Sequence, residues 1–483
     1  MTTTGDPAIL AFGDHRTPAE RQEIGRSARQ SLPRKDQAVY RPAENRPDPI
    51  ALLEEQERSR VANLLPLRHE RMGVSAFTFY RGTAIIMASD LGAQPSSGLQ
   101  AQLCGDAHLS NLGLFAAPDR VPVFDVNDFD ETNPGPFDWD VKRLATSFVL
   151  AASDNGYAKG AVGDAALASA RQYRLSMAEY SRMAEIDIWY DRVDPTALDA
   201  WAQHVDAKGA QRKVRRTVAK AQARTMWTAI NKLTEVVDGR RRFVDQPPLV
   251  VRVPEDSTAR QFMLGSLPGY LESLAPDRRD LLERYEVIDV GHKVVGVGSV
   301  GLLAWVLLLQ GRDESDLLVL QVKQAQHSVL EPYTAPSVYA QMGERVVEGQ
   351  RLMQAASDSF LGWVTGRLGR EYYVRQLRDM KWSPDVSRFT PQALTSYAEL
   401  CGHALARAHA RTGDAIAIAS YLGRSAAFDD AIRSFSLAYA DQVSSDYAAF
   451  QEAVASGRLV SGETTTDSDG FRELLRNPVA PSS

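Results

Sequence analysis

The sequence predicts an α+β protein of two lobes, one helical and assembled from both ends of the chain, and one rich in β-strands. Residues 285–325 consist mainly of Val, Ile, Leu and Gly around a polar turn, which is typical of successive strands. Stretches with helical spacing of apolar residues occupy much of the sequence on either side. A chain of 483 residues is also too long for one ordinary core.

The composition is that of a soluble globular protein, with 44% hydrophobic and 24% charged residues. A net charge of −6 gives no overall attraction to nucleic acid or to an acidic membrane. The two cysteines, Cys104 and Cys401, fit a reducing cytosol better than a disulfide framework. No apolar run reaches the roughly 18 residues that a membrane span needs. The N-terminus shows no signal-peptide pattern, so we expect a cytoplasmic protein.

Changes in composition along the chain set the expected domain boundaries. Residues 1–48 are polar and rich in proline, so we expect an N-terminal arm that is partly disordered. The further expected units are the first part of the helical lobe with its acidic loops (49–284), the β-rich lobe (285–385), the remaining helices of the helical lobe (386–460) and a flexible tail (461–483). Phe77–Gly82 alternates like a strand or a tight aromatic corner, and its Arg81 is either structural or a contact for phosphate.

One stretch, Cys104 to Asp140, concentrates the side chains that carry chemistry. It holds seven Asp, three Asn and one His between apolar segments that are typical of short strands. Acids at the ends of buried strands are costly unless they bind metal or take part in acid/base chemistry. We therefore interpret this stretch as the active site. Its candidate residues are Asp106, His108, Asn111, Asp125, Asp128 and Asp130.

A glycine-rich segment, Gly296 to Gly301, lies much later in the chain. Its spacing alone is a weak sign of a nucleotide-binding βαβ unit, which would need a helix next. Here an apolar, strand-like run follows instead, and a further strand ends at Lys323. This order predicts a glycine-rich lid over nucleotide phosphates, with a lysine that reaches them from the third strand. The candidate lid residues are Gly296, Gly298, Ser299 and Gly301.

Lys323 needs a carboxylate partner if it is to bind phosphates in this way. The next predicted helix, residues 337–356, offers Glu344 and Glu348, which are four residues apart and therefore share one face. The sequence leaves both glutamates open as the partner. The alternative interpretation of Lys323 is an ordinary surface lysine at the end of a strand.

The acidic stretch resembles the catalytic segment of known phosphotransferases. Asp106 and Asn111 are five residues apart, and Asp128 lies 22 residues beyond Asp106. GDAHLSN followed by NDFDE and FDWDVKRLA is similar to the catalytic segment of aminoglycoside and choline phosphotransferases, which have a protein-kinase-like fold. Here the catalytic motifs precede the glycine lid and the lysine, which reverses the usual order. The resemblance therefore implies a circularly permuted, two-lobe kinase-like fold, with the β-rich N-lobe late in the chain and a large helical C-lobe.

The chain as a whole also resembles an uncharacterised bacterial family known only as a domain of unknown function. This second resemblance covers most of residues 30–450. It rests on GDAHLSN, FDVNDFDE, VGVGSVG, QVKQA, GERVVEGQRLMQ and YYVRQLRDMK. It implies the kinase-like fold but brings no established substrate.

The phosphotransferase resemblance implies ATP and Mg²⁺ as cofactors and an acceptor that carries a hydroxyl group. A small-molecule acceptor is expected, and a protein acceptor stays open. Asp106 would orient or deprotonate the acceptor hydroxyl, and Asn111 with Asp128 would hold Mg²⁺. Asp125 stays open as an alternative to Asp128, and Asp130 could join the metal site.

The same resemblance assigns roles to the remaining residues of the site. Glycines of the lid would cover the phosphates, and Lys323 would contact the α- and β-phosphates. His108 would position the loop or take part in catalysis. Asp140 would cap the helix that it begins and tie down the catalytic loop. Residues 371–381 would form the hinge between the lobes, where adenine docks.

Three other interpretations of the sequence stay open. The first two are a kinase-like protein that binds nucleotide without catalysis, and a nucleotidyl transferase that uses the same residues. The third is a metal-dependent phosphoesterase, but it leaves the glycine lid and Lys323 unexplained, and the other histidines form no paired metal-ligand motif. The basic run from Lys208 to Arg224 is either a solvated helical face or a binding surface for an anionic partner such as the acceptor. It lacks the interleaved aromatic residues that stack on bases, so nucleic acid is not expected.

Overall fold

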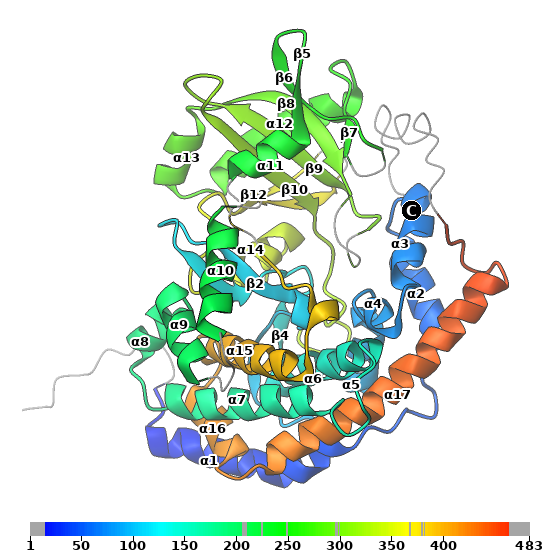
Figure 1. The fold of residues 1–483 in the computed structure, drawn as a ribbon, viewed down its shortest axis with the longest axis vertical. Helices are drawn as coiled ribbons and strands as arrows, with labels where there is room; N and C mark the ends of the chain where they lie inside the picture. The colour runs from blue at the N-terminus through cyan, green and yellow to red at the C-terminus, as the bar shows by residue number, and fades with distance from the viewer. Residues whose placement is uncertain are drawn as a thin grey trace, which may run out of the picture.

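The computed structural model describes residues 15–204, 210–223, 226–247, 250–294, 298, 300–366, 369–377, 380 and 382–462. The chain is a mixed α+β protein, 52% helical and 15% strand, which confirms the α+β part of the predicted fold class. A sheet-rich part lies above a helical part in Figure 1. No helix in the described ranges is both long enough and apolar enough to cross a membrane.

The sheet-rich part contains a six-stranded sheet with the strand order β11-β12-β10-β9-β8-β7, and each neighbouring pair is antiparallel. Its strands are β7 (Val250–Arg252), β8 (Glu286–Lys293), β9 (Ala304–Gln310), β10 (Leu317–Gln324), β11 (Gly362–Thr365) and β12 (Glu371–Gln376). The three strands expected within residues 285–325 are β8, β9 and β10. Because β7 pairs with β8, the sheet begins upstream of residue 285, where the sequence placed its boundary.

Both faces of this sheet are covered along part of its area. On one face, Leu320 and Val322 of β10 pack in a cluster with Met263 of α12 (Thr258–Glu272). On the other face, Leu317 and Val319 pack in a cluster with Ile230 of α11 (Met226–Leu233). A strand that is buried on both sides needs apolar residues at successive positions, which is why β9 and β10 form nearly continuous apolar runs.

The acidic stretch forms two small antiparallel sheets between the large sheet and the helices. β1 (Gln100–Leu103) pairs with β4 (Asn133–Pro136), and β2 (Leu112–Ala116) pairs with β3 (Pro122–Val126). The loop from residue 104 to residue 111 connects β1 to β2, and residues 127–132 connect β3 to β4. These pairings bring the two acidic loops to the same end of the small sheets.

The helical part is built from both ends of the chain, as the sequence predicted. α1 (Pro18–Ser31) packs against α16 (Ala415–Leu422), and α17 (Ala427–Ala455) packs against α6 (Phe137–Asp154) and α7 (Asp164–Tyr180). Figure 1 shows α1 along the bottom of the molecule and α17 running from the bottom up its right-hand side. The core helix α15 (Pro391–Ala410) lies against α7. The remaining helices and strands are α2 (Pro49–Glu57), α3 (Leu65–Met72), α4 (Ala76–Tyr80), α5 (Ala84–Gly92), α8 (Glu185–Tyr190), α9 (Pro195–His204), α10 (Ala210–Gln222), α13 (Pro276–Leu282), α14 (Met342–Met353), β5 (Thr234–Val237) and β6 (Arg240–Phe243).

Two local expectations differ from the structure. The segment read as a strand or an aromatic corner is the short helix α4, because Ser75 and Thr78 form a capping box that starts a helix there. The segment expected as an N-terminal arm contains α1, which also begins with a capping box, between Thr17 and Glu20. In both places a local hydrogen-bond pair overrides what the surrounding composition indicates.

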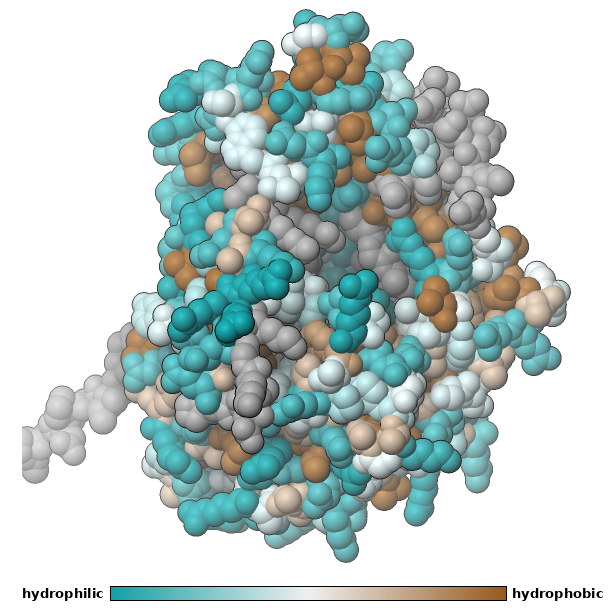
Figure 2. All heavy atoms as spheres, viewed as in Figure 1, coloured by the Kyte–Doolittle hydropathy of each residue, from teal (hydrophilic) through white to brown (hydrophobic). Residues whose placement is uncertain are grey.

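The basic run of the sequence lies on α10, apart from Lys208 and Arg224, which are outside the described residues. Arg212, Arg215 and Arg216 are exposed, and Arg215 forms an ion pair of 2.9 Å with Asp199. Strongly hydrophilic residues cover most of the face shown in Figure 2. The α10 cations therefore form a solvated surface in this structure.

Candidate active site

The loop that follows β1 is fixed by a carboxylate on α6. Asp140 accepts hydrogen bonds from the backbone N–H groups of Cys104, at 2.8 Å, and Gly105, at 3.1 Å. This confirms that Asp140 ties down the loop. The expectation that it caps α6 is wrong, since Asp140 is the fourth residue of that helix and Pro136 is the N-cap. Gly105 has a φ of +79°, and a Cβ there would collide with the carbonyl of Glu131, so only glycine fits.

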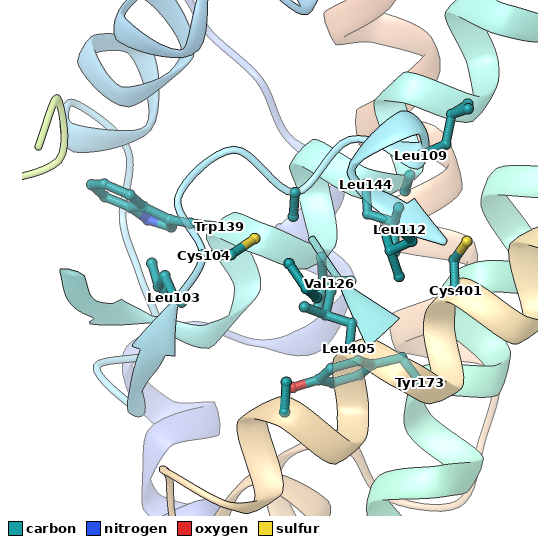
Figure 3. Packing of buried hydrophobic residues seen from close by; sticks show 14 of the residues in the cluster. Leu103, Cys104, Leu109, Leu112, Val126, Trp139, Leu144, Tyr173, Cys401 and Leu405 are labelled. Atoms are coloured by element: carbon teal, nitrogen blue, oxygen red, sulfur yellow. The ribbon is translucent and has the colours of Figure 1, made fainter. Parts of the chain in front are cut away.

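Apolar residues on either side of the polar ones anchor the loop in the core. Leu103, Leu109 and Leu112 are almost fully buried. Figure 3 shows them among side chains of α6 and α15, with Cys104 beside them. Burial raises the pKa of the Cys104 thiol, so this position carries a neutral, packing side chain. The loop is therefore a rigid platform for its polar side chains.

Asp106 lies at the centre of this platform. Its Oδ1 accepts a hydrogen bond of 2.6 Å from Nε of Arg143, and its Oδ2 lies 3.7 Å from Nε2 of His108. Burial raises the pKa of Asp106, while Arg143 acts in the opposite direction. Arg143 is itself held by the ring of Tyr80, 4.2 Å from its guanidinium carbon. The pairing orients Asp106 and leaves Oδ2 for a proton-transfer partner.

Two neighbours of Asp106 complete the loop. The Asn111 side chain donates a hydrogen bond of 2.9 Å from Nδ2 to the Asp106 carbonyl, which leaves its Oδ1 as a donor atom for a cation. The His108 side chain is only 3% exposed, and its Nδ1 has no hydrogen-bond partner among the described residues. Burial lowers the pKa of His108 far below its usual value, and Arg81 and Arg143 act in the same direction. His108 is therefore neutral at pH 7.

The second acidic loop meets the large sheet at Lys323. The ammonium group of Lys323 contacts Oδ2 of Asp130 and lies 3.8 Å from Oδ1 of Asp128. Tyr373, which is the register partner of Lys323 on β12, donates a hydrogen bond of 2.7 Å to Oδ1 of Asp130. The carboxylates raise the pKa of Lys323 against the effect of burial. Asp128 keeps 34% of its side chain exposed and is the most accessible of the three charged groups.

The expected pairing of Lys323 with a glutamate of α14 is wrong. Glu348 forms an ion pair of 2.6 Å with Arg351, and the carboxylates that contact Lys323 come from Asp128 and Asp130 instead. Glu344 lies in the first turn of α14, where its backbone N–H is capped by Gln341. Four-residue spacing places two glutamates on one face of a helix, but it does not say which face turns toward the lysine.

Instead, α14 contacts the site through Arg345, a residue that sequence reasoning missed. Its guanidinium donates to the carbonyls of Asp130 and Gln326, each at 2.7 Å, and also to the carbonyl of Thr132. Arg345 is only 1% exposed. A buried arginine that binds three carbonyls links the helix, the acidic loop and the segment after β10. The sequence indicated this contact only in that a basic residue follows Glu344 directly.

Burial distinguishes Asp125 from Asp128, the two residues that the sequence left open as candidate metal ligands. Asp125 is 1% exposed, and both of its oxygens lie within 2.7 Å of Nη2 of Arg407 on α15. They also accept backbone hydrogen bonds from Val126 and Ala355. Both oxygens of Asp125 are therefore occupied by partners in the core. The prediction of Asp125 as a possible metal ligand is wrong, and its role is structural. Asp128 and Asp130 stay as the carboxylate candidates.

The glycine-rich turn is held by the N-terminal segment of the chain. The Gly298 carbonyl accepts a hydrogen bond of 2.9 Å from Arg68, and the Gly301 carbonyl accepts one of 2.8 Å from Val61. Gly301 has a φ of +92°, which requires glycine. The other two candidate lid residues, Gly296 and Ser299, lie outside the described residues.

These elements line a narrow cleft that is partly open to solvent. Its acidic lining consists of Asp106, Asp128, Asp130 and Glu131, beside Asn111, His108 and Gly298. Burial raises the pKa of Glu131 to about 7. Within the described ranges, no group of three or more His, Cys, Asp and Glu side chains is placed to hold a metal ion alone. Mg²⁺ does not need three protein ligands of this kind, since it keeps several waters and binds one or two carboxylates together with phosphate oxygens.

The expected hinge is described in part. β12 ends at Gln376, and Arg378, Asp379 and Lys381 lie outside the described residues. Leu377 packs in the same apolar cluster as Val319 and Ile230. The residue that follows β12 therefore belongs to the apolar cluster to which α11 contributes.

Residues 60–453 match the model of a protein family described as "Uncharacterized protein conserved in bacteria (DUF2252)". The match covers most of the sequence, so the chain belongs to this family, and the resemblance to an uncharacterised bacterial family is confirmed. No curated protein and no solved structure matches the chain. Family membership assigns neither a reaction nor a ligand to the cleft.

Proposed function

We propose that this member of the DUF2252 family is an ATP- and Mg²⁺-dependent phosphotransferase that acts on a hydroxyl group of a small molecule. One observation carries the proposal. Asp106, Asn111, Asp128 and Asp130 line one cleft, and Lys323, 193 residues from Asp130 in the sequence, contacts that acid from the large sheet. Oxygen ligands for a cation, a lysine for phosphates and an acid for a hydroxyl are the parts that phosphoryl transfer needs.

The order of the elements supports a circularly permuted kinase-like fold. β8, the glycine-rich turn, β9 and β10 with its lysine are followed by helix α14 and by β11 and β12. In protein kinases a glycine-rich loop between strands, a lysine on the third strand and a helix follow one another in the same order. The sheet order, with β12 beside β10 and β10 beside β9, agrees with this comparison.

The end of α15 lies next to the start of the acidic stretch, as permutation requires. α15 ends at Ala410, and the Thr412 hydroxyl accepts a hydrogen bond of 3.2 Å from the backbone of Gln102 on β1. In a chain that was not permuted, α15 would lead through this contact directly into the catalytic loop. Cutting a surface connection and joining neighbouring ends preserves the packing of a fold.

Within this proposal, each residue has a distinct task. Asp106, oriented by Arg143, accepts the proton of the acceptor hydroxyl or aligns it for attack. Asn111 and Asp128 hold Mg²⁺, and Asp130 either joins them or holds Lys323. Mg²⁺, when bound, neutralises charge on the transferred phosphoryl group. Lys323 binds phosphate oxygens from the edge of the same cleft.

Calorimetry of ATP binding with and without Mg²⁺ tests the site. Wild type and Asp119→Ala should bind Mg-ATP equally well, because the Asp119 carboxylate lies on the surface beside Arg192. Lys323→Ala and Asp128→Ala should each bind at least tenfold more weakly. Equal affinity in all four proteins, or no binding by the wild type, refutes the proposed site.

Turnover needs a separate experiment. Wild-type protein and Asp106→Asn are incubated with a metabolite extract and ATP labelled at either the α- or the γ-phosphate. We expect the γ-label to enter a small molecule with the wild type and not with Asp106→Asn. Transfer of the α-label would instead identify a nucleotidyl transferase, and transfer of neither label would favour a protein that only binds nucleotide.

A further inference from the structure

The cleft has a second wall of opposite charge, formed by the side chains of Arg60 and Arg81. Both residues belong to the segment that precedes the acidic stretch, and both line the same cleft as Asp106 and Asp128. The proposed phosphotransferase chemistry uses neither of them. Their contacts indicate what this wall binds.

Arg81 follows α4 and carries a charge that its surroundings compensate poorly. Its Nε is buried without a hydrogen-bond partner among the described residues, and its guanidinium lies 5.8 Å from the ring of Phe77. Burial lowers the pKa of Arg81, and the carboxylate that opposes this effect is Asp106. That carboxylate already receives a hydrogen bond of 2.6 Å from Arg143. A buried guanidinium with unused donors is costly unless a ligand supplies the missing anion.

Arg60 is in a similar situation on the other side of the glycine-rich turn. It is 9% exposed, and Nη1 donates a hydrogen bond of 2.6 Å to the carbonyl of Val300. Its Nε has no hydrogen-bond partner in the described part of the chain. Burial lowers the pKa of Arg60 well below its usual value, and the nearby Arg68 acts in the same direction. Arg60 therefore also lacks a full complement of acceptors.

Among the described residues no ion pair joins either arginine to an acid of the cleft, although Glu131 favours the charge of Arg60 from a distance. Asp106 is paired with Arg143, and Asp130 is paired with Lys323. Both arginines line the cleft, Arg60 beside the glycine-rich turn and Arg81 within the electrostatic reach of Asp106. Planar guanidinium groups match carboxylate and phosphate oxygens, so each of the two can bind an oxyanion that enters the cleft.

We infer that Arg60 and Arg81 form an anion-binding wall, and that the hydroxyl acceptor carries a carboxylate or phosphate group that this wall holds. The anion-binding wall stands on the contacts above, whereas the assignment to the acceptor rests on the proposed phosphotransferase function. The wall positions the hydroxyl of the acceptor near Asp106. Neutral sugars and neutral amino alcohols lack the group that it recognises.

The binding of inorganic phosphate to the full-length protein, measured by calorimetry, tests the wall. Wild type should bind phosphate, and Arg60→Gln and Arg81→Gln should each weaken binding at least tenfold. Arg312→Gln is the matched control, because its side chain is 82% exposed on a turn far from the cleft lining, and it should bind as the wild type does. Arg81→Lys, which keeps the charge but not the planar fork, should show an intermediate loss and serves if Arg81→Gln does not fold. Equal binding by all variants, or none by the wild type, overturns the inference.

A second arm separates the acceptor from the phosphate donor as the source of the anion. If the wall serves the acceptor, phosphate still binds in the presence of a saturating, non-hydrolysable Mg-ATP analogue, and Arg81→Gln leaves affinity for that analogue within about twofold. Competition between phosphate and the analogue, with a tenfold loss of analogue affinity in Arg81→Gln, overturns the assignment to the acceptor. If phosphate binding depends on the arginines but no protein binds Mg-ATP, the wall stands and the proposed phosphotransferase function fails.

Discussion

Two acids of the same short stretch, Asp125 and Asp130, each pair with a basic residue, but they do so in different surroundings. The side chains of Asp125 and Arg407 are 2% and 0% exposed, whereas Asp130 is 21% exposed beside a buried Lys323. The first pair joins β3 to α15 inside the core, and the second lies at the edge of the cleft. A ligand cannot reach the buried pair of Asp125 and Arg407. At the cleft, a ligand could take the place of Asp130 or Lys323 as the partner of the other residue.

Exposure of the ion pair, rather than the type of its residues, indicates which charges support the fold and which are available to a ligand. A buried ion pair that loses one member leaves an uncompensated charge in the core. A pair at the edge of a cleft can be rehydrated when one member is removed. We therefore expect large losses of stability from core substitutions, and losses of binding with little loss of stability from cleft substitutions.

The largest effect is expected for Arg407→Met. The substitution leaves the Asp125 carboxylate buried without its cation, so the free energy of unfolding should fall by about 3–5 kcal/mol. Urea denaturation at pH 7 measures the change. The double variant Asp125→Asn with Arg407→Met should recover part of the loss, because a neutral amide needs no cation. A loss below about 1 kcal/mol in Arg407→Met would contradict the structural role of the pair.

Asp140→Ala should have the next largest effect. It leaves the N–H groups of Cys104 and Gly105 unsatisfied in a buried loop, which should cost about 2–4 kcal/mol. Chemical denaturation measures this cost, and Asp119→Ala on the surface should stay within about 0.5 kcal/mol of the wild type. If both substitutions had the same small effect, the loop would not depend on Asp140 for its position.

The buried side chain of His292 should make the stability of the protein depend on pH. Burial lowers the pKa of His292 from its usual 6.5 to about 3, so the folded state resists the protonation that the unfolded chain undergoes. This contribution to stability is fully present above pH 6.5 and is lost as pH falls toward 3. Compared with His292→Phe, the wild type should lose about 2 kcal/mol of unfolding free energy between pH 7.5 and pH 5. A pH-independent difference between the two proteins would show that His292 is not buried as a neutral ring.

The smallest effect on stability is expected for Lys323→Met. Its partner Asp130 is partly exposed and keeps the hydrogen bond from Tyr373, so the free energy of unfolding should change by about 1 kcal/mol or less. The same variant should lose affinity for Mg-ATP, as proposed above. Thermal unfolding combined with calorimetry separates the two readouts. A loss as large as that of Arg407→Met would place Lys323 among the structural charges.

Local sequence patterns were enough to predict several parts of the protein. The apolar runs and the polar turn of residues 285–325 predicted β8, β9 and β10 because strand length and apolar content are local properties. The concentration of acids between short apolar segments indicated the stretch that lines the cleft. Ser75 with Thr78, by contrast, was a local capping signal that the alternating aromatic residues obscured.

Only the tertiary structure decided which charged residues meet. The sequence favoured Asp128 over Asp125 only by its likeness to a phosphotransferase pattern, and the approach of Arg407 from α15 made Asp125 structural. Glu344 and Arg345 are adjacent on α14, and the orientation of that helix turned the arginine toward the acidic loop. The sequence by itself determined the strands, the acidic stretch and the order of glycine turn and lysine, since these depend on neighbours along the chain. Ion pairing depends on neighbours in space, which are brought together by packing across hundreds of residues.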